Sequence, residues 1–322
     1  MKIFVTGGTG FIGTHLVKCL AETEHELVCL ARKTSDQSTL KELGVTIALG
    51  DVTDKVSLVK GMRGCDWVAN LANLFLFWVP DEKVYTDVNV EGTRNVMEAA
   101  LEMGISKVVH VSTGAVWGKA DWPISEETPI GARKASKYAQ TKYEGEQIAW
   151  RLHKEHGLPL VMVYPAAVVG PDDPKAAGRY VKNIARHRMP AQVLTESPFP
   201  FVYVGDVCKA VLRALETEGN IGEKYLVSGA NMTWGELNHM ICDIAGVPLP
   251  PLRLPDALTV FSARLLTGLA NLTKRPPLLD LSVDQVDMMK QGFVIDGSKA
   301  ERELGLRYTP IRQALEEAIA SF

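Results

Sequence analysis

The chain has 322 residues, 46% of them hydrophobic, which is enough to bury the core of one large domain or of a domain with a second lobe. Its 35 Lys and Arg residues against 38 Asp and Glu residues give a net charge of −3, without long blocks of either sign. This balance argues against nucleic acid or an anionic membrane surface as the main partner and favours a small-molecule substrate.

The five cysteines are scattered and lack CxxC spacing, a usage typical of reduced thiols in the cytosol. The chain opens on a strand-like run from Lys2 to Val5 and not on a signal peptide. Its apolar stretches are too short for a membrane span, and no pattern of metal ligands stands out. We therefore expect a cytoplasmic protein with neither a membrane span nor a bound metal.

From residue 2 to about 165, short β-branched runs alternate with longer segments of helical periodicity. The predicted strands are Ile3–Val5, Leu27–Leu30, Val45–Leu49, Trp67–Asn70, Val108–Val111 and Leu160–Val163. The predicted helices are Phe11–Glu22, Asp81–Met103 and Ala135–His156, the last two stopped by Gly104 and Gly157. This alternation predicts an α/β fold, a Rossmann doubly wound parallel sheet formed by residues 1–165.

After residue 165 prolines become frequent, which predicts a smaller C-terminal substrate lobe over residues 166–322. Some elements of this half should return to the Rossmann core. The expected elements are strands at 201–204 and 224–227, and helices at 206–216 and 233–245, the second with a capping box of Thr233 and Glu236. The apolar stretch from Leu258 to Leu272 is expected to form a packed amphipathic helix, with a membrane-surface contact or a dimer face as alternatives.

A glycine-rich turn, Thr6-Gly7-Gly8-Thr9-Gly10-Phe11-Ile12-Gly13, follows the first strand and opens the first helix. Glycines in this context let the backbone approach a pyrophosphate at the helix N-terminus. The candidate phosphate-binding residues are Gly7, Thr9, Gly10, Phe11, Ile12 and Gly13. The turn predicts a nicotinamide dinucleotide as cofactor.

The second strand ends in Arg32 and Lys33, where NAD-binding proteins carry an acid that binds the ribose 2′-hydroxyl. A guanidinium and an ammonium suit a 2′-phosphate, so we expect NADP to be preferred, with NAD possible. Asp51 and Val52, after the third strand, are placed for the adenine. The residues after the fourth strand, Leu71, Ala72 and Asn73, are placed for the nicotinamide side.

Tyr138 and Lys142 lie one turn apart on a predicted helix. A lysine ammonium beside the phenol would favour the phenolate and lower the pKa of the tyrosine, making Tyr138 a usable acid and base. Ser112 and Thr113, at the end of the preceding strand, offer hydroxyls for a substrate oxygen beside Tyr138.

Taken together, these residues resemble the extended short-chain dehydrogenase/reductases, also called the NAD-dependent epimerase/dehydratase family. The resemblance covers nearly the whole chain and includes 6–13, 50–54, 89–93, 111–118, Tyr138 with Lys142, and 164–171. It implies that Tyr138 is the proton donor or acceptor, that Lys142 binds the nicotinamide ribose, and that Thr113 is the third catalytic hydroxyl. It also places Tyr164, Pro165 and Val168 at the nicotinamide.

Within the family the chain resembles the dihydroflavonol-reductase and 3β-hydroxysteroid-dehydrogenase-like branch, because it has Arg32 at the second strand and an apolar segment at 75–78. Sugar-nucleotide epimerases usually have an arginine where Tyr164 stands and a tyrosine where Trp117 stands. The candidate substrate residues are Phe75, Phe77, Trp78, Trp117, Arg179 and Tyr203.

The sequence thus predicts an NADP(H)-dependent oxidoreductase that reduces an apolar or aromatic ketone or aldehyde to an alcohol. Two alternatives stay open: an NAD-dependent sugar-nucleotide epimerase or dehydratase, and a non-catalytic NADP(H)-sensing regulatory protein. The resemblance further implies a homodimer formed through the helices at 81–103 and 135–156.

Overall fold

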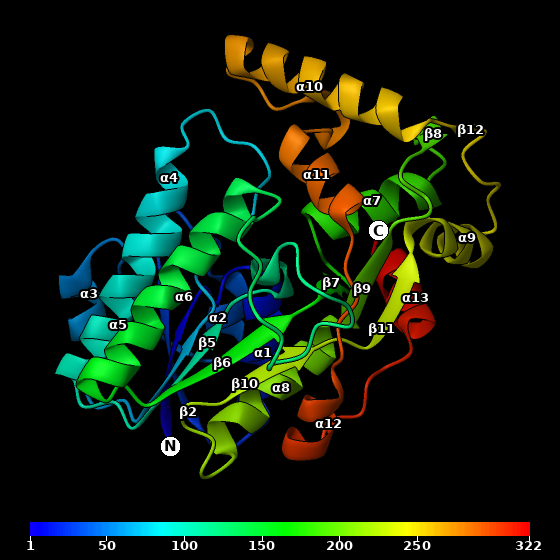
Figure 1. Cartoon of the computed structure of the whole chain (residues 1–322). Coiled ribbons are helices and arrows are strands. Elements are labelled where there is room, and N and C mark those ends of the chain that lie inside the picture. The colour runs from blue at the N-terminus through cyan, green and yellow to red at the C-terminus, as the bar shows by residue number, and fades with distance from the viewer.

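The computed structural model describes residues 1–322 except for the side chain of Ala176. Its centre is a parallel seven-stranded sheet in the order β10-β6-β5-β4-β1-β2-β3 (Figure 1). The strands are β1 (Lys2–Thr6), β2 (Glu26–Ala31), β3 (Thr46–Leu49), β4 (Trp67–Asn70), β5 (Lys107–Val111), β6 (Leu160–Pro165) and β10 (Lys224–Val227). The predicted doubly wound sheet is confirmed, and β10 is a strand of the second half that returns to it.

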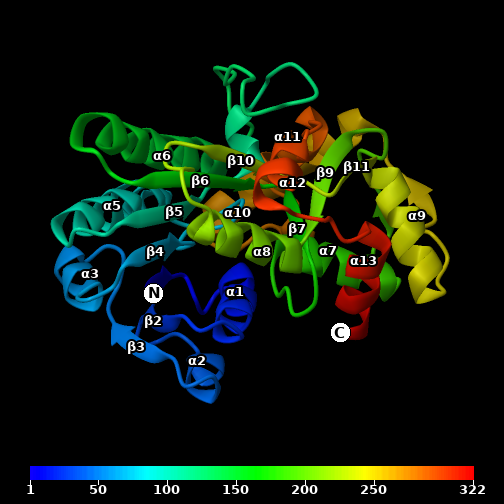
Figure 2. The ribbon, with the colours of Figure 1, turned by 90° about the horizontal axis from the view of Figure 1, so that it is seen from below.

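Helices cover both faces of this sheet (Figure 2). One face carries α3 (Lys55–Gly61), α5 (Gly92–Glu102) and α6 (Lys137–His156). The other carries α1 (Phe11–Ala21), α8 (Val204–Glu216) and α12 (Ser298–Leu304), with α2 (Ser38–Glu42) beside α1. Alternation along β1 serves both layers, since Phe4 joins the core under α3 and α5 whereas Ile3 and Val5 join the core under α1 and α8.

The helix predicted over 81–103 is interrupted. It consists of α4 (Lys83–Tyr85), a π-helical turn (Thr86–Glu91) and α5. It stops before Gly104, which adopts a φ of +66° as a helix-ending glycine does. Helix α6 begins two residues later than predicted because Ser136 caps it, accepting a hydrogen bond from the backbone nitrogen of Ala139 at 3.1 Å.

The second half also builds a separate three-stranded sheet in the order β11-β9-β7. Its strands are β7 (Ala167–Val169), β9 (Pro198–Tyr203) and β11 (Ala230–Thr233), and a two-stranded pair joins β8 (Ala191–Gln192) to β12 (Leu252–Arg253). The helices of this half are α7 (Ala176–Ala185), α9 (Trp234–Ala245), α10 (Asp256–Thr273), α11 (Val283–Gln291) and α13 (Ile311–Ala320). A 3₁₀ turn spans Leu278–Asp280 in this half, and another spans Gly114–Trp117 after β5. The predicted capping box of Thr233 and Glu236 is present. The division at 165/166 stays a proposal, since β10 and α8 belong to the central layers.

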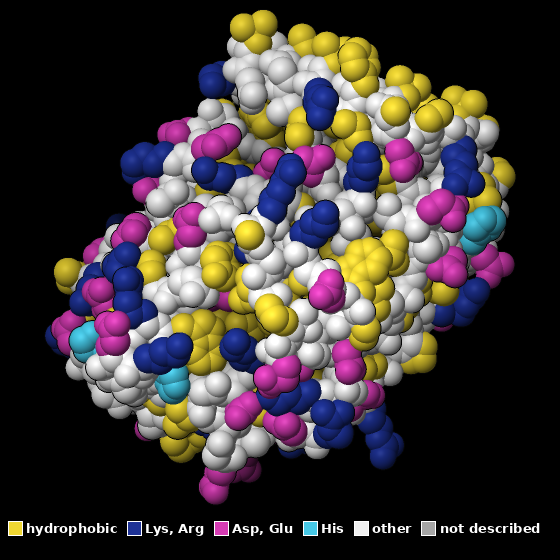
Figure 3. All heavy atoms as spheres, in the orientation of Figure 1, with side chains coloured by type: hydrophobic (Ala, Val, Ile, Leu, Met, Phe, Trp, Pro, Cys, Tyr) yellow, Lys and Arg dark blue, Asp and Glu magenta, His cyan; other side chains and the backbone are white. Residues whose placement is uncertain are grey.

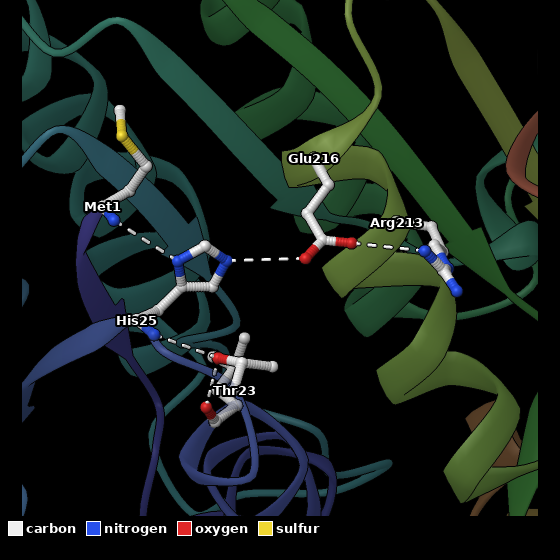
Figure 4. Close-up of polar contacts among 6 residues, drawn as sticks. Met1, Thr23, His25, Arg213 and Glu216 are labelled. Atoms are coloured by element: carbon white, nitrogen blue, oxygen red, sulfur yellow. Dashed lines mark hydrogen bonds and ion pairs between the residues drawn. The ribbon is translucent and has the colours of Figure 1, made fainter.

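A polar cluster lies beside the amino ends of β1 and β2 (Figure 4). The Nδ1 atom of His25 lies 3.4 Å from the amino nitrogen of Met1, and its Nε2 atom lies 3.5 Å from a carboxylate oxygen of Glu216 at the end of α8. Arg213 approaches the other oxygen of Glu216 at 3.5 Å. The cluster thus links the start of β2 to the end of α8, so we assign it a structural role.

None of the described helices is long and apolar enough to cross a membrane.

Candidate active site

The turn between β1 and α1 brings backbone segments unusually close together. Gly7 has a φ of +72°, and a Cβ at this position would lie 2.8 Å from the backbone nitrogen of Ala72. A Cβ at Gly13 would overlap the carbonyl oxygen of Gly7. Gly10 begins α1 without a side-chain cap, which leaves the first amides of the helix available to an anion.

These amides border a cavity of about 550 Å³ at the carboxyl ends of the strands. The predicted cofactor residues that line it are Gly7, Thr9, Gly10, Phe11, Ile12, Gly13, Arg32, Asp51, Val52, Leu71, Ala72, Asn73, Tyr138, Pro165 and Val168. Three others, Lys33, Lys142 and Tyr164, are not among the described residues that line it. The tertiary structure therefore gathers residues from five strand ends around one space.

Arg32 and Asp51 mark the end of the cavity beside β2 and β3. One carboxylate oxygen of Asp51 accepts hydrogen bonds from the backbone nitrogen and the hydroxyl of Thr53, both at 2.9 Å. The other oxygen is left for a ligand. Arg32 is exposed and forms no ion pair among the described side chains, while its neighbour Lys33 is exposed outside the cavity. Arg32 is thus the cation that faces the predicted adenosine end.

Tyr138 and Thr113 both line the cavity. Tyr138 lies in the first turn of α6, and Thr113 follows β5. Burial raises the pKa of Tyr138, and a hydrogen bond from the side chain of Thr113 offsets part of this rise. The ring of Phe75 packs edge-on against Tyr138, with ring centroids 4.9 Å apart. The phenol is therefore held protonated at the surface of an apolar space.

Lys142 lies one turn further along α6 and is 1% exposed. Its ammonium donates a hydrogen bond to the carbonyl oxygen of Val111 at 2.8 Å. Burial lowers the pKa of Lys142 to about 8, opposed by the charge of Glu146. The expected lowering of the pKa of Tyr138 by Lys142 is not found, since burial raises this pKa and the group that lowers it is Thr113.

Glu146 completes this buried layer. The hydroxyl of Ser112 donates to one of its carboxylate oxygens at 2.7 Å, while the other oxygen has no hydrogen-bond partner among the described residues. Burial raises the pKa of Glu146 to about 7, against the opposing effects of Ser112 and Lys142. Since the hydroxyl of Ser112 is committed to Glu146, Thr113 is the hydroxyl that serves Tyr138.

The π-helical turn places Asn89 between two walls of the site. Its amide oxygen accepts a hydrogen bond from the backbone nitrogen of Leu74 at 2.7 Å, and its amide nitrogen donates to the hydroxyl of Thr141 at 3.0 Å. Asn89 thus fixes the loop after β4, which carries Phe75, against the helix that carries Tyr138. A π turn at such a position is common at functional sites.

Two of the predicted substrate residues, Phe75 and Phe77, line the cavity. Trp117 does not: it is fully buried, its indole nitrogen donates to the carbonyl oxygen of Thr128, and its ring packs on Tyr164 at 4.8 Å. Tyr164 is equally buried, so both aromatic rings belong to the core under α6 and not to the ligand space.

The remaining three substrate candidates are held outside the described cavity lining by partners of their own. Trp78 donates to Asn271, Arg179 pairs with Asp280, and Tyr203 donates to Glu317, at distances of 2.8, 2.8 and 2.5 Å. We therefore withdraw these three residues and Trp117 from the pocket. Residue type alone does not reveal where a side chain finds its partner.

Sequence reasoning missed most of the wall opposite Phe75. The added lining residues are Tyr180, Phe199, Trp234, Gln285, Met288, Met289 and Phe293. They come from α7, β9, α9, α11 and the segment after α11, where no motif marks them. The one signal in the sequence that could have indicated these residues is the abundance of apolar residues in the second half, which does not single out individual positions. Among the described residues there is no cluster of His, Cys, Asp or Glu that could hold a metal ion.

Comparison with known proteins identifies the family of the chain. The model of the NAD dependent epimerase/dehydratase family matches residues 3–228. Sterol demethylase protein B of Methylococcus capsulatus is 33% identical over 333 residues, which cover 100% of this chain and 98% of that protein. A Synechocystis protein provisionally named dihydroflavonol 4-reductase is 32% identical over 332 residues, covering 99% and 94%.

Among solved structures, the crystal structure of gox2253 is 36% identical, with a TM-score of 0.86 over 99% of this chain and 97% of that chain. The chain therefore belongs to the NAD-dependent epimerase/dehydratase family of extended short-chain dehydrogenase/reductases, and it is an NAD(P)-dependent oxidoreductase that acts on hydroxyl and carbonyl groups.

Proposed function

We propose that this enzyme uses NADPH to reduce an apolar or aromatic ketone or aldehyde to an alcohol. One observation carries the proposal: a single cavity joins Arg32, at the adenosine end, to a wall of aromatic and methionine side chains at the other end. Tyr138 and Thr113 lie between the two ends. The names of the Synechocystis and Methylococcus relatives, a reductase and a sterol-modifying protein, support an apolar substrate.

The residues present fit a dinucleotide. The open amides of α1 would bind the pyrophosphate. This binding requires the backbone segments of the turn to lie close together, and a Cβ at Gly7 or Gly13 would prevent that. Asp51 retains an oxygen for the adenine amine, and Arg32 suits a 2′-phosphate. When bound, NADPH supplies the hydride for the carbonyl carbon.

The protein's own residues handle the proton. Tyr138 donates its phenolic proton to the carbonyl oxygen as negative charge develops there, and burial keeps that proton in place at neutral pH. Thr113 orients the same oxygen. By the family resemblance we assign Lys142, whose ammonium donates to the carbonyl oxygen of Val111, to the nicotinamide ribose and to stabilising the phenolate that Tyr138 becomes. The apolar lining excludes water from the reacting centre.

The test is calorimetric titration with NADPH and NADH, after extraction to detect retained cofactor, followed by a screen of flavanonol, steroid and terpenoid carbonyl compounds. We expect at least a tenfold preference for NADPH, about 1.4 kcal/mol, and NADPH oxidation with part of the panel. Tightly retained NAD and conversion of nucleotide sugars without net cofactor consumption would indicate the epimerase or dehydratase activity. Binding of NADPH without turnover on any carbonyl compound would indicate the sensor.

We also propose a homodimer formed through α5 and α6, which lie side by side on one face of the sheet (Figure 1). Light scattering of the purified enzyme tests it, and a monomer at working concentration would rule it out.

A further inference from the structure

Helix α10 exposes most of its large apolar side chains, while Val260 and Leu266 are partly buried. Thr259, Ala263 and Ala270 are buried in contact with the body of the protein. The opposite side of the helix carries five large apolar residues, Leu258, Phe261, Leu265, Leu269 and Leu272, which are 46–81% exposed. Their spacing of three and four residues forms one continuous stripe. The expected amphipathic helix is present and packs on the body through one side, while most of its large apolar side chains lie on the exposed side.

Exposed large hydrophobic residues are concentrated in and next to this stripe. Of the 15 exposed large hydrophobic residues described in the chain, seven lie between residues 258 and 279, because Leu278 and Leu279 add to the five on α10. Figure 3 shows hydrophobic side chains gathered along the edge of the molecule that α10 forms. Single exposed leucines are ordinary, whereas a contiguous patch indicates a surface that is covered in use. We call these seven residues the α10 face.

The charges beside the α10 face are mainly positive. Between residues 256 and 279 stand three basic residues, Arg264, Lys274 and Arg275, and one acidic residue, Asp256. All four are exposed, and none forms an ion pair among the described side chains. The chain as a whole carries −3, so this positive charge is local. A helix with an apolar stripe flanked by cations is typical of one that lies on an anionic lipid surface.

The α10 face also lies over the apolar end of the active-site cavity. Trp78 donates to Asn271 of α10 at 2.8 Å, and Lys274 donates to the carbonyl oxygen of Pro80 at 3.4 Å. Both bonds hold the loop that follows the cavity residue Phe77. On its inner side α10 packs on α11, which supplies Met288 and Met289 to the cavity. Both walls of the substrate end are therefore attached to α10.

We propose that the α10 face docks on the surface of an anionic membrane, with the apolar stripe among the acyl chains and Arg264, Lys274 and Arg275 at the phosphate groups. A second copy of the chain suits the face less well, since Asp256 alone could pair with the three cations of its partner. The nearly balanced net charge of the chain, which argues against a membrane as its main partner, is a sum over the whole surface. It does not describe the charge of the one face that would contact the membrane. Delivery of an apolar substrate from the bilayer would rest on the proposed function, whereas docking does not.

The experiment is flotation of the full-length protein with vesicles of phosphatidylcholine alone or mixed with phosphatidylglycerol. We expect binding to the mixed vesicles that weakens at high salt. The double variant Phe261→Ser with Leu265→Ser should lose about tenfold or more of this binding. The triple variant Arg264→Gln, Lys274→Gln and Arg275→Gln should lose the preference for phosphatidylglycerol. A matched control, Val56→Ser with Ile221→Ser, removes exposed apolar residues elsewhere and should bind like the wild type.

Thermal melting and NADPH titration of each variant check that the fold and the cofactor site are intact. All substituted residues are exposed, and Lys274 also donates to the carbonyl oxygen of Pro80. The proposal is overturned if the wild type does not float with the mixed vesicles, or if the Phe261 and Leu265 variant floats as well as the wild type. It is also overturned if light scattering shows a dimer that this variant alone abolishes, since a second copy would then cover the face. None of these outcomes depends on carbonyl reduction, so the two proposals fail separately.

Discussion

Lys142 and Glu146 lie one turn apart on α6 and are 1% and 0% exposed, so a cation and an acid share the buried layer behind Tyr138. Burial disfavours the charged form of each, and the charge of each favours the charged form of the other. The pair therefore influences the pH range over which Lys142 stays protonated.

Glu146→Gln should shift the alkaline limb of the kcat/KM profile to lower pH, by on the order of one pH unit. The physical reason is that the amide no longer opposes the loss of the proton from Lys142, whose pKa of about 8 falls further. The pH profile of carbonyl reduction measures the shift, and Glu144→Gln, an exposed acid on the same helix, is the control. An unchanged limb would mean that Glu146 has only a structural role.

The same variant should also alter the pH dependence of stability. Burial raises the pKa of Glu146 to about 7 in the folded protein, so its contribution to stability is present at low pH and is lost as pH rises through that value. Glutamine does not titrate. The stability of Glu146→Gln relative to the wild type should therefore increase between about pH 5 and pH 8, as measured by urea unfolding. A constant difference would contradict the assignment.

Tyr138→Phe should lower the turnover number by about 10²–10⁴-fold and leave NADPH affinity nearly unchanged, because only the proton donor is lost. Single-turnover kinetics and calorimetry separate these two quantities. Tyr143→Phe is the matched control, since Tyr143 lies on the same helix and is not among the described lining residues of the cavity. Substantial turnover by Tyr138→Phe would refute the acid role.

Arg32→Ala should weaken NADPH binding by about 1–3 kcal/mol and leave NADH binding nearly unchanged, because the guanidinium is assigned to the 2′-phosphate alone. Calorimetric titration of both nucleotides gives the comparison. Lys33→Ala supplies the control: this neighbouring cation lies outside the described lining and should have a small effect. Equal losses for both nucleotides would show that Arg32 contacts something other than the 2′-phosphate.

Gly13→Ala should abolish dinucleotide binding and lower the melting temperature, because the added Cβ would overlap the carbonyl oxygen of Gly7. Gly268→Ala adds the same methyl group to α10, where nothing lies within 4 Å. There it should stabilise the fold by about 0.5–1 kcal/mol, since alanine is the better helix former. Calorimetric melting of the two variants measures both effects, and normal nucleotide binding by Gly13→Ala would contradict the tight turn.

The sequence by itself determined the central fold. Local signals were enough, because alternation in strands, periodicity in helices and the glycine turn are set by neighbours within a few residues. The capping box at Thr233 and the glycines after α5 and α6 are of this kind. The π turn around Asn89 was not foreseen, because its contacts to Leu74 and Thr141 cross from one element to another.

Only the tertiary structure decided which aromatic residues border the cavity and which way α10 faces. Trp117 resembles a pocket residue in sequence, yet it packs on Tyr164, whereas Phe293 carries no signal and lines the cavity. Periodicity showed that α10 has two different sides, but a helical repeat does not state which side the body covers. Burial is set by partners distant in sequence, and in α10 those partners cover two alanines and a threonine while four of its five leucines are exposed.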